Sequence, residues 1–197
     1  MKPEAKPPKF QFDDDAHRYY LGTTEIPGVT HVLDTMGLVS DFAKRPEYAL
    51  RGHLVHRAAA LYGNGALEWS TIDPRILGYV ISVTRFYESL QVKPVALEIP
   101  DYHPDFLYGY TFDGIGSSNM GDILWDFKTG RATKVGTALQ TAAYLDPVQR
   151  KYGGKWKRLA VELDEDGGLP NLRWYSDRSD WPNFLSCLNC YRLKEAS

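Results

Sequence analysis

The stretch that most constrains the fold is 122–130, where an apolar run ends in an acid, one spacer residue and a lysine. An apolar run bounded by turn residues predicts a buried β-strand, here over Ile123–Lys128. Because side chains alternate between the two faces of a strand, Asp126 and Lys128 lie on one face and Phe127 on the other. The chain is therefore expected to form a sheet with a charged site at the end of one strand.

A second acid, Asp113, follows an aromatic segment and precedes Asp126 by thirteen residues. On adjacent strands these two carboxylates can bind a hard divalent cation such as Mg²⁺ or Mn²⁺, with a backbone carbonyl as a further oxygen ligand. Lys128 adds the cation that phosphodiester hydrolysis needs. The alternative is an ordinary ion pair between Asp126 and Lys128 at a strand end, because short motifs of this kind often occur by chance.

The composition indicates one folded domain. The chain has 197 residues, of which 43% are hydrophobic and 24% charged, so it can bury a core. The first nine residues are rich in proline and lysine, and we expect an extended or disordered tail over 1–9 before a single domain over 10–197.

The charge pattern is uneven along the chain. The net charge of −2 gives no general support for nucleic-acid binding. Basic residues nevertheless gather in one segment, and it forms either a solvated face or a contact with a phosphate backbone. This segment contains Arg150, Lys151, Lys155, Lys157 and Arg158.

The two cysteines, Cys187 and Cys190, are too few for a four-thiolate zinc site or an iron–sulfur cluster, and they exclude a disulfide scaffold. Free thiols fit a reducing, intracellular compartment, and we expect the protein in the cytoplasm. No apolar stretch reaches the length of a membrane span, and the N-terminus lacks the apolar run of a signal peptide, so we expect no membrane partner.

Turn and capping signals divide the chain into helices and strands. Pro46 suits a first helical turn and Gly63 a helix end, while Asp73 and Pro74 suit an N-cap and the position after it. The signals predict helices over Pro46–Tyr62, Pro74–Leu90, Gly136–Tyr152 and from Ser179 to about Leu193. They predict strands over Val95–Ile99, Tyr108–Phe112, Ile123–Lys128, Trp156–Leu163 and Leu172–Tyr175. Before these elements we expect a small hairpin of Phe10–Phe12 and Tyr19–Leu21 around Asp13–Asp15, and a short helix or strand over Val29–Met36. This order predicts an α/β domain in which helices flank a mixed sheet.

Further polar residues lie at spacings that place them on shared faces. His53 and His56 are one helical turn apart, so both can bind a metal, or one can serve a site while the other is solvated. Gln140 and Tyr144 share a face of the helix after the Asp126 strand, where they bind a phosphate or pack in the core. Glu98 precedes Asp113 by one strand and either supports the site or is exposed.

Taken in order, these residues resemble the motif series of the PD-(D/E)XK nuclease superfamily, in its RecB-like exonuclease branch. The resemblance covers residues 45–165 and rests on Gly52-x-x-x-His56, Asp113, Asp126-x-Lys128 and Gln140-x-x-x-Tyr144. The stretch 19–33 is similar to the N-terminal lead-in of phage-type members. The resemblance implies a restriction-endonuclease-like core, with a mixed β-sheet flanked by helices.

The resemblance also implies roles for individual residues. His56, Asp113 and Asp126 would bind the Mg²⁺ or Mn²⁺ ion, with the Phe127 carbonyl as a further ligand. Asp113, Asp126 and Lys128 would be the catalytic residues, with Lys128 orienting and helping to deprotonate the attacking water.

In the same way, Gln140 and Tyr144 would bind the substrate, and Arg150, Lys151 and Lys155 are possible contacts to the DNA backbone. No iron–sulfur cluster is expected, since family members that hold one use four cysteines. The implied function is a metal-dependent deoxyribonuclease, expected to be an exonuclease, in recombination, repair or phage DNA processing, with DNA and a recombination or replication protein as partners.

Two other functions are compatible with the same residues. One is a non-catalytic nucleic-acid-binding module on the same fold. The other is a zinc enzyme that uses His53 and His56 with a carboxylate.

Overall fold

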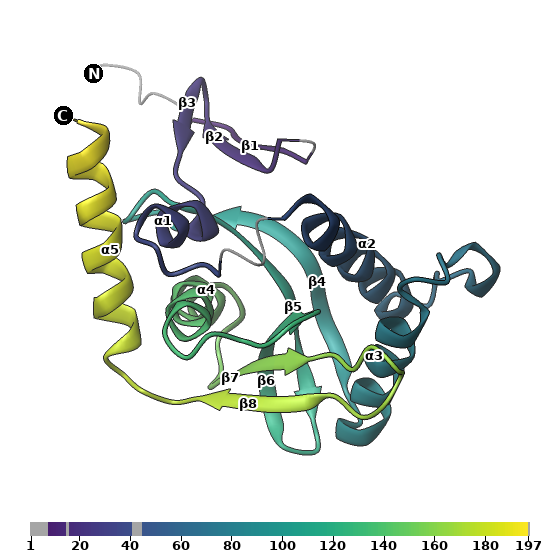
Figure 1. Cartoon of the computed structure of the whole chain (residues 1–197). Coiled ribbons are helices and arrows are strands. Elements are labelled where there is room, and N and C mark those ends of the chain that lie inside the picture. Colours follow the sequence, from purple (N-terminus) through teal and green to yellow (C-terminus); the bar gives the residue numbers. More distant parts are fainter. Residues whose placement is uncertain (1–7, 15, 41–44, 197) are drawn as a thin grey trace.

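The computed structural model describes residues 8–14, 16–40 and 45–196, so most of the expected tail over 1–9 lies outside the described residues. A five-stranded sheet with the order β4-β5-β6-β7-β8 forms the centre of the molecule (Figure 1). Its strands are β4 (Lys93–Tyr102), β5 (Gly109–Ser118), β6 (Gly121–Lys128), β7 (Lys157–Glu162) and β8 (Asn171–Tyr175). The sheet is mixed, because β6 and β7 are parallel while the other neighbouring pairs are antiparallel.

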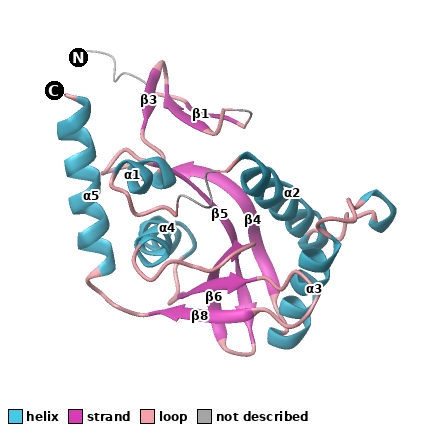
Figure 2. Cartoon of the chain, in the orientation of Figure 1, coloured by secondary structure: helices cyan, strands magenta, loops and turns pink. Residues whose placement is uncertain are grey.

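Helices cover both faces of this sheet, as the sequence predicts (Figure 2). The helices are α1 (Val29–Thr35), α2 (Pro46–Gly63), α3 (Leu77–Leu90), α4 (Gly136–Tyr152) and α5 (Asp180–Glu195), with a short 3-10 helix, η2 (Trp69–Thr71). Helices α2 and α3 pack on one face, and α1, α4 and α5 pack on the other. The helix α4 is the crossover between the two parallel strands, as a parallel pair requires.

The alternation predicted for β6 is confirmed. Trp125 and Phe127 pack against Phe86 of α3, with ring centroids 5.6 and 5.4 Å from that of Phe86. Leu124 belongs to the core under α4 and α5. Asp126 and Lys128, which have the same parity as Leu124, therefore face α4.

The predicted N-terminal hairpin is also present. Strands β1 (Phe10–Asp13) and β2 (Arg18–Leu21) pair antiparallel, and a third strand that the sequence did not predict, β3 (Thr24–Ile26), completes a small sheet. Asp15 of the acidic turn lies outside the described residues. The ring of Tyr19 packs so closely on Gly109 that a Cβ there would lie 2.0 Å from it, and this contact anchors the small sheet on the start of β5.

Several predicted boundaries are wrong, including those of β4, which the sequence predicts over Val95–Ile99 and which spans Lys93–Tyr102. Helix α3 begins at Leu77 rather than at Pro74, because Asp73 accepts hydrogen bonds from Arg75 in a tight turn instead of capping a helix. Strand β5 continues to Ser118, well beyond the predicted end at Phe112. Gly114 interrupts the sequence signal for a strand, yet the strand needs this glycine because a Cβ there would lie 2.0 Å from the ring of Trp125.

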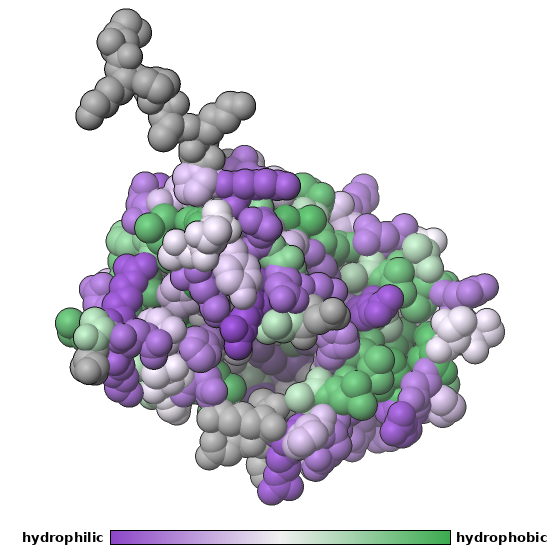
Figure 3. All heavy atoms as spheres, turned by 90° about the horizontal axis from the view of Figure 1, so that it is seen from above, coloured by the Kyte–Doolittle hydropathy of each residue, from purple (hydrophilic) through white to green (hydrophobic). Residues whose placement is uncertain are grey.

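The face seen from above is mostly hydrophilic, with hydrophobic side chains gathered toward the α2 side (Figure 3). Leu50 and Leu61 of α2 are 54% and 40% exposed. Cys187 and Cys190 are free thiols, the first half-buried and the second exposed. Among the residues that the structure describes, none of the helices is both long and apolar enough to cross a membrane.

A buried arginine joins three elements on the α4 side of the sheet. Arg158 of β7 is 5% exposed, and its guanidinium donates to the Ala138 carbonyl of α4 at 2.7 Å. It also donates to the Asp177 carbonyl and to the Asp180 carboxylate at the start of α5, at 2.9 and 2.6 Å. These bonds fix α4 and α5 on the sheet.

We therefore expect Arg158→Ala to lower the free energy of unfolding by about 3 kcal/mol, because it leaves the Asp180 carboxylate buried without its partner. Arg173→Ala is the matched control on the neighbouring strand, because the Arg173 side chain is 39% exposed and also forms an ion pair, with Glu162. We expect this control to lower the free energy of unfolding by less than about 1 kcal/mol. Urea unfolding measures both, and equal losses would contradict the prediction.

Candidate active site

The site forms where β5 and β6 separate. The two strands pair from Ser118 opposite Gly121 as far as Gly114 opposite Trp125. At the next residues the Phe127 amide donates instead to Oδ2 of Asp113, at 2.5 Å. The Asp113 carboxylate thus takes the place of a ladder partner and is held against β6, beside Asp126.

Two further side chains meet Asp113 from neighbouring elements. His56 of α2 places Nδ1 3.0 Å from Oδ1 of Asp113 and 3.7 Å from Oε1 of Glu98. Glu98 lies opposite Asp113, because Leu97 pairs with Gly114 and Ile99 with Phe112. One ligand atom each of His56, Glu98 and Asp113 lie within 4.8 Å of one another, so these three residues can hold a metal ion.

The backbone at Glu98 is strained, since its φ is +49° in the left-handed region that a glutamate rarely adopts. Such strain is found most often where a side chain is held in place for function. The sequence could not predict this turn of the backbone, and the analysis of spacing alone left the position of Glu98 open. The structure brings it into the metal-binding group.

The electrostatics of this group favour a positive charge at its centre. Burial by itself lowers the pKa of His56, but the charges of Asp113 and Glu98 and their hydrogen bonds outweigh it and raise that pKa well above 6.5. Burial raises the pKa of Glu98, and so does the neighbouring charge of Asp113. Burial is also the main reason that the pKa of Asp126 is raised, and Asp113 adds to it. Carboxylates this close together are stabilised by a shared cation.

A chain of polar contacts leads from Asp126 to α4. Nζ of Lys128 lies 2.7 Å from Oδ2 of Asp126 and donates to Oε1 of Gln140 at 3.0 Å. Nε2 of Gln140 in turn donates to the Tyr144 hydroxyl at 2.9 Å. Oδ2 of Asp126 is buried, and the Lys128 ammonium is the cation that balances it.

The N-terminal sheet adds residues near the site that the sequence analysis missed. Tyr19 Oη is within hydrogen-bond distance of Nε2 of His17, at 3.1 Å, and of Oγ1 of Thr111, at 3.0 Å. Burial raises the pKa of Tyr19 to about 12, so its hydroxyl remains protonated at neutral pH. Burial and the charge of Asp126 raise the pKa of Tyr144, which also lies in a small cavity with Tyr19. No periodicity in the sequence links β2 to these residues.

Arg51 of α2 holds the segment that follows Lys128. Its guanidinium donates to the Thr129 carbonyl at 3.2 Å and lies over the rings of Tyr48 and Tyr79, 4.8 and 5.1 Å from their centroids. This contact fixes the end of β6 against the helix that carries His56. Nothing in the sequence singles out Arg51, because one arginine in a helix carries no signal of its own.

Of the two predicted helical histidines, only one joins the site. His53 is exposed on α2 and does not belong to the metal-binding group formed by the described residues. The zinc site with two histidines therefore has no support from the geometry. The predicted ligand Phe127 donates its amide to Asp113, which places its peptide at the edge of the group.

The predicted DNA-backbone residues are at the opposite end of α4 from Gln140, and two of them are neutralised. Arg150 pairs with Asp105 and Asp146, at 2.6 and 2.7 Å, and Lys151 pairs with Asp101 at 2.6 Å. Lys155 is exposed, and no partner contacts its side chain within the described part of the chain.

A comparison with protein-family models finds no match, and a comparison with curated proteins finds no similar sequence. The function must therefore be argued from the site itself. The imidazole of His56 and the carboxylates of Glu98 and Asp113 fit a divalent cation that accepts mixed nitrogen and oxygen ligands, such as Mn²⁺, and the carboxylates fit Mg²⁺. The predicted ligand Asp126 is not among these three grouped residues and instead pairs with Lys128.

We expect His56→Ala to abolish most of the rise in melting temperature that Mn²⁺ produces, because a ligand stabilises only the state that binds it. His53→Ala on the same helix is the matched control and should keep the full rise. Thermal unfolding with Mn²⁺ and with EDTA gives the comparison. An equal rise in both variants would place the ion elsewhere.

Glu98→Gln keeps the shape of the side chain and removes its charge, so we expect the Kd for Mn²⁺ to rise about tenfold. Isothermal titration calorimetry without DNA measures this directly. Glu88→Gln, on the exposed surface of α3, should leave the Kd unchanged. An unchanged Kd in Glu98→Gln would remove this carboxylate from the site.

Proposed function

We propose that the chain is a metal-dependent deoxyribonuclease with a restriction-endonuclease-like core, of the RecB-like PD-(D/E)XK type. The observation that carries the proposal is the meeting of Asp113 and Asp126 at the strand fork, with Lys128 one alternation further on the same face. A lysine beside paired carboxylates is suited to phosphodiester hydrolysis, where negative charge builds up on the phosphate.

The order of the elements also supports the proposal. His56 comes from the helix before the sheet, Glu98 and Asp113 from an antiparallel pair, and Asp126 and Lys128 from the strand that leads into the crossover helix α4. Gln140 and Tyr144 then return on α4 to the same site. Apart from Glu98, this is the motif order of the family that the sequence resembles, and five elements, α2, β4, β5, β6 and α4, contribute to the site.

The ligands for the cation would be His56, Glu98, Asp113 and Asp126, with the Phe127 carbonyl at the edge. When bound, a divalent cation neutralises phosphate oxygens and makes a nearby water more acidic. Without an ion, Asp113 and Glu98 raise the pKa of His56 and so favour its positively charged form.

Lys128 provides a cation and an exchangeable proton at Nζ. Gln140 fixes that group by accepting one of its hydrogen bonds, and the Asp126 carboxylate balances its charge. Since the Tyr144 oxygen accepts from Gln140, its own hydrogen remains available to donate to a phosphate oxygen. The chain from Lys128 to Tyr144 therefore orients two donors toward a substrate phosphate.

The molecule offers few cations to the DNA backbone. The net charge is −2, and Arg150 and Lys151 are engaged in ion pairs. Of the three predicted backbone contacts, Lys155 is the one that has no partner among the described residues. We propose that a recombination or replication protein helps this protein to bind long DNA tightly. The alternative is that the DNA is held mainly by residues close to the candidate active site.

Lys128→Ala is expected to lower the rate of DNA hydrolysis at least about a hundredfold, because it removes the charge that stabilises the transition state. The test is incubation of end-labelled single- and double-stranded DNA with wild type and variant, with Mg²⁺, Mn²⁺ or EDTA. The product ladder shows whether cleavage starts from an end.

Lys93→Ala, at the exposed start of β4, is the control for a lost surface lysine and should cleave as wild type does. A Lys128→Ala variant that is folded and fully active would refute the proposal. Metal-independent binding without cleavage by wild type would instead favour a non-catalytic nucleic-acid-binding module.

A further inference from the structure

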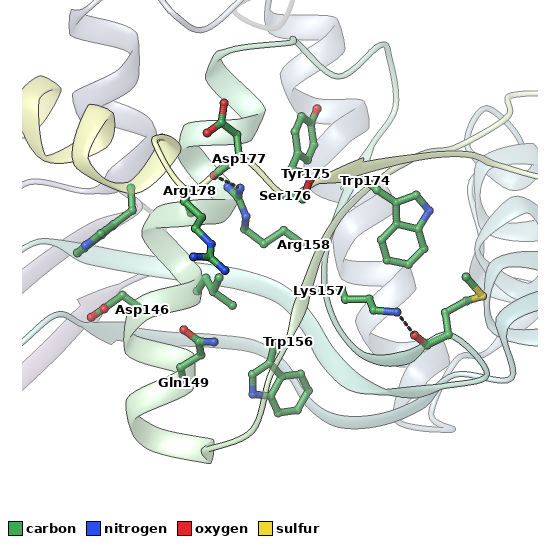
Figure 4. A pocket seen from close by; sticks show the side chains of 14 residues that line it. Asp146, Gln149, Trp156, Lys157, Arg158, Trp174, Tyr175, Ser176, Asp177 and Arg178 are labelled. Carbon is green, nitrogen blue, oxygen red and sulfur yellow. Dashed lines mark hydrogen bonds between the residues drawn. The ribbon is translucent and has the colours of Figure 1, made fainter.

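A second cavity lies on the other side of α4. An open groove of about 620 Å³ lies between α4, the start of β7 and the connection from β8 to α5 (Figure 4). Ala142 and Gln149 of α4 line it, whereas Gln140 and Tyr144 face Lys128. Residues two apart on a helix do not share a face, so the groove is separate from the candidate active site. Its volume is that of a small-ligand site.

The groove gathers tryptophan side chains. Three of the five tryptophans of the chain line it, namely Trp156, Trp174 and Trp181. Trp174 lies on the edge strand β8 and is 38% exposed, and Trp156 is half-buried with Nε1 donating to the Gly153 carbonyl at 2.6 Å. Exposed indole faces in a groove stack on flat aromatic rings, and nucleobases are the flat rings that such platforms bind without regard to sequence.

The charges of the groove favour an anion. The Arg178 side chain extends toward Asp146 and Gln149, while the Asp177 carboxylate points the other way (Figure 4). Among the described residues, neither Arg178 nor Lys157 has a carboxylate partner, and Lys157 donates to the Met120 carbonyl at 2.6 Å.

The other charged groups of the groove are already balanced within the protein. Arg158 is paired with Asp180, and Asp146 is shared by His103 and Arg150. The Asp177 carboxylate accepts two hydrogen bonds from Ser179. Among the described residues that line the groove, Arg178 is therefore the cation left for a ligand, because Lys157 is turned toward the Met120 carbonyl (Figure 4).

We propose that this groove binds a nucleotide unit of single-stranded DNA, with the base stacked on the indole of Trp174 or Trp156 and the phosphate facing Arg178. The inference rests on the proposed function for the choice of DNA as the polymer. Binding in the groove requires neither the metal nor hydrolysis, so the two proposals can be tested apart. The groove would hold the strand away from the site of cleavage.

The test is fluorescence anisotropy of a labelled short oligothymidylate with the full-length protein in EDTA. We expect Trp174→Ala to weaken binding about tenfold through loss of stacking, and Trp174→Phe to restore most of the affinity. Arg178→Gln should weaken binding and reduce the slope of log K against log salt by about one. Trp69→Ala, which removes a tryptophan that is 48% exposed on η2, is the matched control and should bind as wild type does.

Thermal unfolding of each variant confirms that it is folded. The inference is overturned if Trp174→Ala and Arg178→Gln bind as tightly as Trp69→Ala, which is also the result expected if a protein segment occupies the groove. If wild type cleaves no DNA but its affinity depends on Trp174, the proposed function fails and the groove remains. If it cleaves DNA and affinity is insensitive to Trp174 and Arg178, the groove inference alone fails.

Discussion

The hydrogen bond from the Phe127 amide to the Asp113 carboxylate is the contact on which the rest of the site depends. It satisfies a backbone donor that loses its ladder partner where β5 leaves β6, so it removes the cost of opening the sheet. It also turns Asp113 toward His56 and Glu98. One side chain thus ends the strand pairing and completes the group with His56 and Glu98 that could hold a metal ion. A neutral residue of the same size could accept the bond but could not balance the charge of a bound cation.

The buried carboxylates of the site lower the stability of the folded protein, and other parts of the fold offset this loss. Burial raises the pKa of Asp126 and of Glu98, so their charged forms are costly in the folded protein without a cation. Lys128 and a positively charged His56 offset part of that cost. The two hydrophobic cores and the buried ion pair of Arg158 supply stability elsewhere. A group of carboxylates kept together at a net cost is typical of a binding site.

Helix α4 organises the functional surfaces because it presents different faces to different partners. One face carries Gln140 and Tyr144 to Lys128, another lines the groove of tryptophans, and the last turn is joined through Asp146 and Arg150 to His103 and Asp105. His103 is fully buried, and its Nδ1 accepts from the amides of the turn that follows it. The basic residues at the end of the helix are thereby engaged in surface ion pairs.

The sequence by itself determined the α/β class, most helices and strands, and the faces of β6, because these follow from local periodicity and capping. It also determined which residues to examine at the site, through the spacing of Asp113, Asp126 and Lys128. Only the tertiary structure decided that Glu98 and not His53 joins His56, that Arg150 and Lys151 are neutralised, and that three tryptophans share one groove. These outcomes depend on contacts between segments far apart in the chain and on a strained backbone at Glu98, and neither leaves a periodic signal in the sequence.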